Sequence, residues 1–264
     1  MKLFVESVAI LAPGLVGWTA GRAILAGDKT YEPAPLAPPV ADLLPAVERR
    51  RTGSTVKFAL AVGHEALISA GRPVDSVATV FVSSGNDGDV INDICITLAG
   101  SDRQVSPTRF HNSVHNAPSG YWGIATHSHH PSTSLCGFDW SFAIGLLEAA
   151  AQLQVDRHEV LLVAYDTPYP EPLSGIRPVA EPFGAALLFT RDRASRTIAE
   201  IEVTMDAQPK EISRMRDAAL EQLRTGNPCA RALPLLAALA GGQPQVVTLE
   251  RDAGQTLSVC VRAI

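Results

Sequence analysis

Residues 132–141, STSLCGFDWS, hold the side chains of this sequence that are best suited to chemistry. Small and apolar residues alternate first, and the Ala- and Leu-rich helical pattern FAIGLLEAAAQ follows at residues 142–152. A strand that turns sharply into a helix presents a side chain at the helix N-terminus, where a thiolate or other nucleophile is activated. The junction therefore indicates a nucleophile-bearing turn with three candidate residues, Cys136, Asp139 and Ser141.

Each candidate also fits a purely structural role. A cysteine inside a strand is ordinarily a small buried hydrophobe, which is what we expect of Cys136. Asp139 is suited to cap the following helix beside Trp140. Ser141 stands in GFDWSFA, which lacks the GxSxG pattern of a hydrolase nucleophile, so we expect it in the first turn. An autonomous acyltransferase that uses Cys136 remains an alternative.

Three histidines, His127, His129 and His130 in THSHHP, form a second cluster with chemical potential. Their spacing suits a metal ion, and a metal-dependent hydrolase is a further alternative. No carboxylate or fourth ligand lies beside them, so we expect a loop at an interface and neither metal nor cofactor. Asn86, Asp87 and Asp89 are expected to form a turn with a helix cap, because the glutamate that completes a calcium loop is absent.

The composition describes a globular protein that can bury a sizeable core: 264 residues, 46% hydrophobic and 19% charged. A net charge of −5 argues against a nucleic-acid partner. Four cysteines without a CxxC pair fit reduced thiols, and we expect the protein in the cytoplasm. No membrane span is expected, since no run approaches the roughly 18 apolar residues that one needs. Glu6 and Pro13 interrupt the first apolar run, which favours a strand over a signal peptide.

Strand-like and helix-like segments alternate along the chain, which is typical of an α/β sheet with a mixed edge. The near-continuous apolar run at residues 158–166 indicates a strand covered on both faces. Further expected strands lie at 4–11, 77–89 with its turn, 182–190 and 197–207, with a closing hairpin at 245–263. Helices are expected at 55–71, 90–100, 209–226 and 230–242, and an extended Pro-rich crossing at 31–45.

Two segments, NSVHNAPSGYW at 112–122 and HPSTSLCGFDWSFAIGLLEAAA at 130–151, carry a family resemblance. With VLLVAYD and PFGAALLF after them, they resemble the N-terminal half of β-ketoacyl-acyl-carrier-protein synthases. The sequence looks closest to the half-length members that serve as chain-length factors in aryl-polyene and related type II systems. The resemblance implies a thiolase-like half-domain over residues 1–207, with a five-stranded mixed sheet between helices. A C-terminal helix and β-hairpin extension, residues 208–264, is expected to pack on the same domain.

The same resemblance implies that the reaction centre is degenerate. Counting from Pro131 and Ser132 without a gap puts Asp139 at the nucleophile position, and Cys136 falls three residues early. A carboxylate is comfortable at a helix N-terminus but is a poor acyl carrier. The family's two catalytic histidines come from a C-terminal half, and no histidine follows His158 here. We therefore expect no catalytic residue and a non-catalytic role.

The resemblance also implies a heterodimer with a full-length ketosynthase, which receives the acyl carrier protein through the complex. The expected partner interface is the strand bearing Ser132, Ser134, Cys136 and Phe138, paired antiparallel with its counterpart. The expected gate at the end of the partner's acyl tunnel comprises five residues: Phe110, Val114, Ala117, Tyr121 and Trp122. A dimerisation module without influence on the product is a third possibility.

Overall fold

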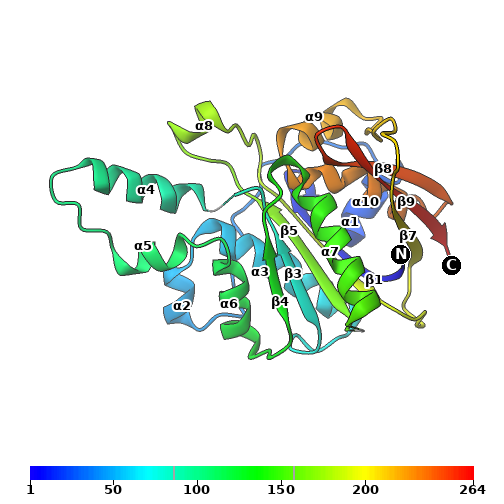
Figure 1. Cartoon of the computed structure of the whole chain (residues 1–264), viewed down its shortest axis with the longest axis horizontal. Coiled ribbons are helices and arrows are strands. Elements are labelled where there is room, and N and C mark those ends of the chain that lie inside the picture. Colours follow the sequence, from blue (N-terminus) through cyan, green and yellow to red (C-terminus); the bar gives the residue numbers. More distant parts are fainter. Residues whose placement is uncertain (86, 157) are drawn as a thin grey trace.

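The computed structural model describes residues 1–85, 87–156 and 158–264, and one mixed β-sheet runs through them (Figure 1). The strand order is β4-β3-β5-β6-β1-β7-β9-β8, and the short β2 pairs with β1 beside this path. The strands are β1 (Lys2–Ala12), β2 (Leu15–Val16), β3 (Ala78–Val82), β4 (Ser132–Leu135), β5 (Val160–Asp166), β6 (Phe183–Thr190), β7 (Ala199–Met205), β8 (Gln245–Asp252) and β9 (Gln255–Ala263).

The domain expected over residues 1–207 supplies the part of the sheet from β4 to β7, which has the order β4-β3-β5-β6-β1-β7. β4, β3 and β5 are parallel, whereas β5–β6 and β6–β1 are antiparallel, so the sheet is mixed as expected. The sheet is nevertheless larger than five strands, because it continues through β7 into the β9–β8 hairpin. β9 pairs with β7 from Ala199↔Ala263 to Met205↔Leu257, and so supplies the backbone partners that β7 would otherwise lack.

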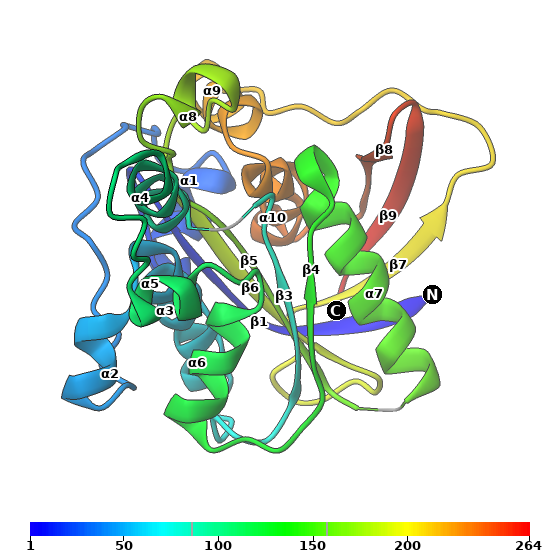
Figure 2. The ribbon, with the colours of Figure 1, turned by 60° about the vertical axis from the view of Figure 1, so that its left-hand side comes forward.

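Helices cover both faces of the sheet (Figure 2). One face carries α3 (Ser54–Ala70) and α6 (Ala117–Thr126). The other face carries α7 (Ser141–Val155), α10 (Leu233–Gly241) and α1 (Trp18–Leu25). β5 lies between the two layers and all of its residues are buried, as its apolar run predicts. The other helices are α2 (Ala46–Arg51), α4 (Gly88–Ala99), α5 (Pro107–Asn112), α8 (Leu173–Ile176), α9 (Ala218–Gly226), η1 (Phe138–Trp140) and η2 (Cys229–Ala232).

The helix expected at 209–226 is wrong in its first half, since α9 begins only at Ala218. The preceding residues run along the edge of β8, where Ser213 N–H donates to Thr248 O and Thr248 N–H donates to the Ser213 hydroxyl. Asp217 then caps α9 by accepting from Ala219 N–H and Leu220 N–H. Pairing with a sheet edge thus overrides the helical pattern of these residues.

The helices α4 and α5 project from the body as an arm (Figure 1). Asp87 caps α4 by accepting from Val90 N–H, as expected; Asn86 lies outside the described residues. An ion pair between Asp93 and Arg109 links the two helices. Apolar side chains of the arm stay exposed, among them Ile96 and Leu98. Among the helices in the described ranges, none combines the length and apolarity needed to cross a membrane.

Candidate functional site

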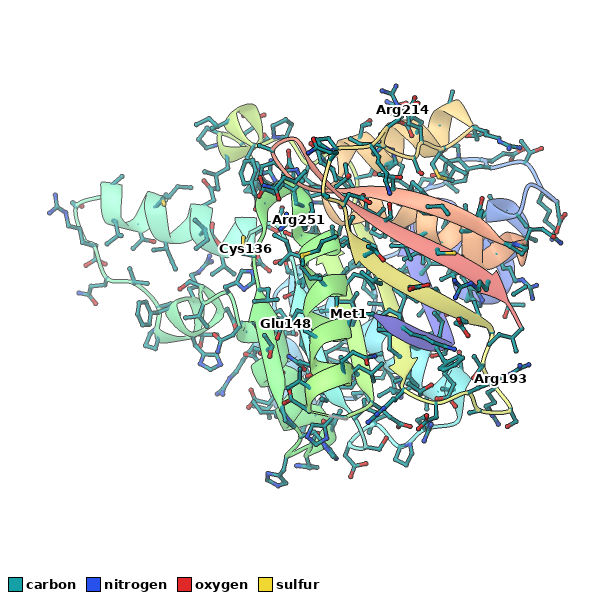
Figure 3. All side chains as sticks on the ribbon, turned by 45° about the vertical axis from the view of Figure 1, so that its right-hand side comes forward. Met1, Cys136, Glu148, Arg193, Arg214 and Arg251 are labelled. Carbon is teal, nitrogen blue, oxygen red and sulfur yellow. The ribbon has the colours of Figure 1, made fainter. Side chains whose placement is uncertain are left out.

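The turn between β4 and α7, beside the labelled Cys136 in Figure 3, is sharp and conformationally restrained. Gly137 is followed by Phe138, whose φ of 53° lies in the left-handed region that a bulky residue rarely adopts. A Cβ at Gly137 would lie 2.4 Å from Ile144 Cδ1 and 3.2 Å from Ser141 Cα, so a larger residue would have to displace the Ile144 side chain and crowd the helix backbone. Ser141 braces the turn: its Oγ accepts from Gly137 N–H at 3.0 Å and lies 3.0 Å from Ser83 O. The Ser141 hydroxyl therefore has a structural role in the turn.

The position at which the resemblance puts a nucleophile is occupied by a carboxylate in ion pairs. Asp139 Oδ1 lies 2.6 Å from Arg177 Nη1, and Asp139 Oδ2 lies 3.2 Å from Arg231 Nη2. Arg231 Nη1 also contacts Glu250 Oε2 at 2.6 Å. The expectation that Asp139 caps the helix is wrong, because no side-chain cap bond forms at the start of η1 or α7. The arginines attract the carboxylate away from the helix N-terminus.

Cys136 differs from expectation in its environment. It follows the last residue of β4, Leu135, and is exposed instead of buried inside the strand. Its thiol contacts Ser84 O at 3.3 Å. The strand ends earlier than the sequence pattern indicates because Gly137 begins the turn.

Beneath the turn lies a buried polar cluster that sequence reasoning missed. Asp166, the last residue of β5, accepts from Ser84 N–H and from the Ser84 hydroxyl at 2.8 and 3.0 Å. Burial raises the pKa of Asp166 to about 6. Burial also raises the pKa of the Cys229 thiol well above its usual value, so this thiol stays protonated and is a weak nucleophile. An aspartate at the end of the otherwise apolar run VLLVAYD was the signal available in the sequence.

Residues 26–251 match the family model of the β-ketoacyl synthase N-terminal domain. The chain belongs to this family. No curated protein matches its sequence. The thiolase-like ketosynthase fold is confirmed by solved structures.

The first is ketosynthase ApeO in complex with its chain length factor ApeC from Xenorhabdus doucetiae, with a TM-score of 0.74 and 21% identity over 98% of this chain and 99% of that chain. The second is the ishigamide ketosynthase/chain length factor, with a TM-score of 0.73 and 15% identity over 100% and 99%. The third is AntDE:AntF, a type II acyl-carrier protein in complex with its ketosynthase, with a TM-score of 0.76 and 13% identity over 100% and 99%. At these identities the likeness concerns the fold.

In this β-ketoacyl synthase-like chain, β4 is the end strand of the sheet and pairs with β3. Pro131 O and Leu135 O accept from N–H groups of the β3 side, at Thr79 and Ser83. Because backbone groups alternate along a strand, those of Ser132 and Ser134 face the open edge. Cys136 and Phe138, the other expected interface residues, are exposed just beyond it.

The five expected gate residues do not share one surface. Phe110 and Val114 are 67% and 46% exposed on and beside the arm. Tyr121 and Trp122 are each 2% exposed, and Ala117 is also buried. The Trp122 ring packs edge-on against Phe81, and Tyr121 packs against His111. Tyr121 and Trp122 therefore belong to the core of their own domain, because α6 turns this face toward the sheet.

The histidine cluster does not converge on a point. His127, His129 and His130 are exposed, and His127 ends α6 with a left-handed φ of 57°. The His130 ring lies edge-on to His158, with 6.1 Å between centroids. Within the described ranges, no group of three or more His, Cys, Asp or Glu side chains is arranged to hold a metal ion.

A small cavity lies where the starts of α3 and α6 meet the loop after β3, and both polar and apolar residues line it. It measures about 10 Å³, which is room for about one water molecule. Its lining includes Thr55, Asp87, Asn112, His115 and Tyr165. Such a cavity is far too small for an acyl chain.

Proposed function

We propose that this protein is a non-catalytic subunit that pairs with a full-length β-ketoacyl synthase and limits the length of the acyl chain built there on an acyl carrier protein. One observation carries the proposal: Asp139, at the position where the resemblance puts the family's nucleophile, is engaged by Arg177 and Arg231. An ion-paired carboxylate is stabilised in its charged form and makes a poor covalent carrier of an acyl group.

Two further features support the absence of a condensation reaction on this chain. No histidine follows His158, so the residues that decarboxylate the extender unit in the family have no counterpart in the C-terminal extension. The cavity at the start of α6, at about 10 Å³, is too small for an acyl chain. We propose that the growing chain resides in the partner.

The open edge of β4 supports a sheet-forming partner. Unpaired N–H and C=O groups on an end strand recruit another strand. The solved relatives are described as a ketosynthase with its chain length factor, and we extend that arrangement to this chain. The partner's strand would run antiparallel to Ser132–Leu135.

The arm supports a role in chain length. Phe110 and Val114 present apolar groups to the surroundings instead of to their own core. Inserted into the end of a partner's tunnel, they would oppose each extra methylene by steric overlap, at about 1 to 3 kcal/mol. The gate that we propose is therefore Phe110 with Val114.

The exposed thiol of Cys136 favours one competing function, an autonomous acyltransferase. Co-expression with a full-length ketosynthase separates the two. A one-to-one complex whose product length depends on the arm supports the proposal. Acyl transfer by the isolated chain that is lost in Cys136→Ala would replace it. If substitutions in the arm do not change the length of the product made by the complex, the chain would be a dimerisation module without influence on the product.

A further inference from the structure

The two arginines that hold Asp139 come from separate parts of the chain. Arg177 follows α8 in the segment that connects β5 to β6, and Arg231 lies in η2 of the C-terminal extension. Each guanidinium takes a different carboxylate oxygen, at 2.6 Å for Arg177 and 3.2 Å for Arg231. Asp139 thus joins three segments at one point.

Both arginines are also held by contacts that do not involve Asp139. The Arg177 guanidinium lies over the Phe138 ring, 3.6 Å from its centroid, and Arg231 contacts Glu250 at 2.6 Å. The Asn227 side chain donates to Asp166 O at 3.3 Å and to Glu181 O at 2.8 Å, which brackets the segment that carries Arg177. The two guanidinium groups are therefore positioned in advance of the carboxylate between them.

The charge balance at this point favours an anion. The Arg177 and Arg231 side chains are only 21% and 24% exposed, so solvent screens their mutual repulsion incompletely. Without Asp139, Glu250 would be the carboxylate left in contact with the pair, and it touches Arg231 alone. Arg177 Nη2 is in addition buried without a hydrogen-bond partner in the described structure. Two fixed guanidinium groups with spare donors match the geometry of a small carboxylate.

We propose that Arg177 and Arg231 form a carboxylate-binding seat at the turn, which Asp139 fills from within the chain and which accepts a free carboxylate such as acetate when that side chain is removed. All residues of the seat belong to this chain, so the proposal does not depend on the binding of a ketosynthase. In this proposal, Asp139 is the internal ligand of the two arginines.

The experiment measures the melting temperature of Asp139→Ala against acetate concentration, with sodium chloride at matched ionic strength. We expect the variant to melt below the wild type, and acetate to recover several degrees with a saturable dependence. The wild type and the double variant Asp139→Ala/Arg177→Gln should show no saturable effect. Glu200→Ala is the matched control, because Glu200 also contacts two cations, Lys2 and Arg262, but these are 55% and 48% exposed. Their mobility should prevent recovery.

A second variant covers the case in which Asp139→Ala does not fold. In Asp139→Cys, made with Cys136→Ser, the seat should stabilise the introduced thiolate and hold the pKa of that thiol at about 7.5 or below, against about 8.5 for a free cysteine. The pH dependence of alkylation by iodoacetamide reports this value, and Arg177→Gln should return it toward normal. A folded Asp139→Ala without a saturable acetate effect, or an ordinary pKa for the thiol introduced by Asp139→Cys, would overturn the seat.

Discussion

Asp166 Oδ1 accepts two hydrogen bonds from a single residue, Ser84, one from its backbone N–H at 2.8 Å and one from its hydroxyl at 3.0 Å. The pair ties the end of β5 to the loop after β3, directly under the turn that carries Asp139. Asp166 Oδ2 is buried without a hydrogen-bond partner in the described structure. A fully ionised carboxylate is therefore incompletely compensated at this position.

Stability should consequently depend on the ionisation of Asp166. Its pKa is raised from 3.8 to about 6 by burial, so the folded state binds a proton that the unfolded state releases. The stabilisation is complete below pH 3.8 and is lost as the pH rises through about 6. Relative to Asp166→Asn, the wild type should lose up to roughly 3 kcal/mol in free energy of unfolding across this window. Urea unfolding of both proteins between pH 4 and pH 8 measures the difference.

Glu221→Gln provides a control of opposite sign. The hydrogen bond from Arg224 holds the pKa of Glu221 below its usual value. The contribution of Glu221 to the free energy of unfolding should be present above the unfolded-state pKa and disappear as the pH falls.

For the prediction on Asp166, parallel curves of unfolding free energy against pH for Asp166→Asn and the wild type would show that Asp166 is not the titrating group.

The isolated chain should take up no acyl group from acyl-carrier thioesters. Asp139 is a poor acyl carrier because Arg177 and Arg231 hold its carboxylate in ion pairs, and the cavity at the start of α6, at about 10 Å³, is too small for an acyl chain. Intact-mass analysis after incubation with an acyl donor should show the unmodified mass, and a stable adduct on Cys136 would contradict it. Asp139→Cys should accept a long acyl group at most slowly and should not condense it, because the family's histidine pair remains absent.

Partner binding should depend on the backbone of β4. Ser134→Pro removes an N–H that faces the open edge, a substitution that an edge strand tolerates without unfolding. We expect the variant to keep its melting temperature within a few degrees and to lose co-purification with the ketosynthase. Ser134→Ala retains the N–H and is the matched control. Unimpaired complex formation by a folded Ser134→Pro would exclude pairing through this edge.

Product length should respond to the arm. In the reconstituted heterodimer, Phe110→Ala and Val114→Ala should lengthen the product because they remove bulk, and Val114→Trp should shorten it. Mass spectrometry of the products measures the change. Unchanged lengths with all three folded variants would refute the gate.

Trp122→Ala separates gate from core. This residue is 2% exposed and packs against Phe81, so truncation should cost about 3 to 5 kcal/mol of stability without a specific change in product. If a folded Trp122→Ala variant changed the product length, Trp122 would belong to the gate.

Periodicity predicted the elements whose local pattern agrees with their surroundings. The apolar run of β5 and the helical spacing of α3 appear almost where the sequence indicates them. Prediction failed where partners distant in the sequence determine the local structure, as at Ser213, which lies along the edge of β8. The partners of Asp139 come from residues 177 and 231, and no local pattern reveals that pairing. The burial of Tyr121 and Trp122 was not predicted, because a motif does not tell which face of α6 meets the sheet.

The C-terminal hairpin bears on the stoichiometry of assembly. At the β8 end of the sheet, residues around Ser213 already occupy part of the outer edge, while at the β4 end Ser132 and Ser134 face outward. A sheet with two free ends could add strands in both directions and form a filament. Because Ser213 occupies part of the β8 edge through its two hydrogen bonds with Thr248, we expect the proposed pairing at the β4 end to give a complex of two sheets and no filament.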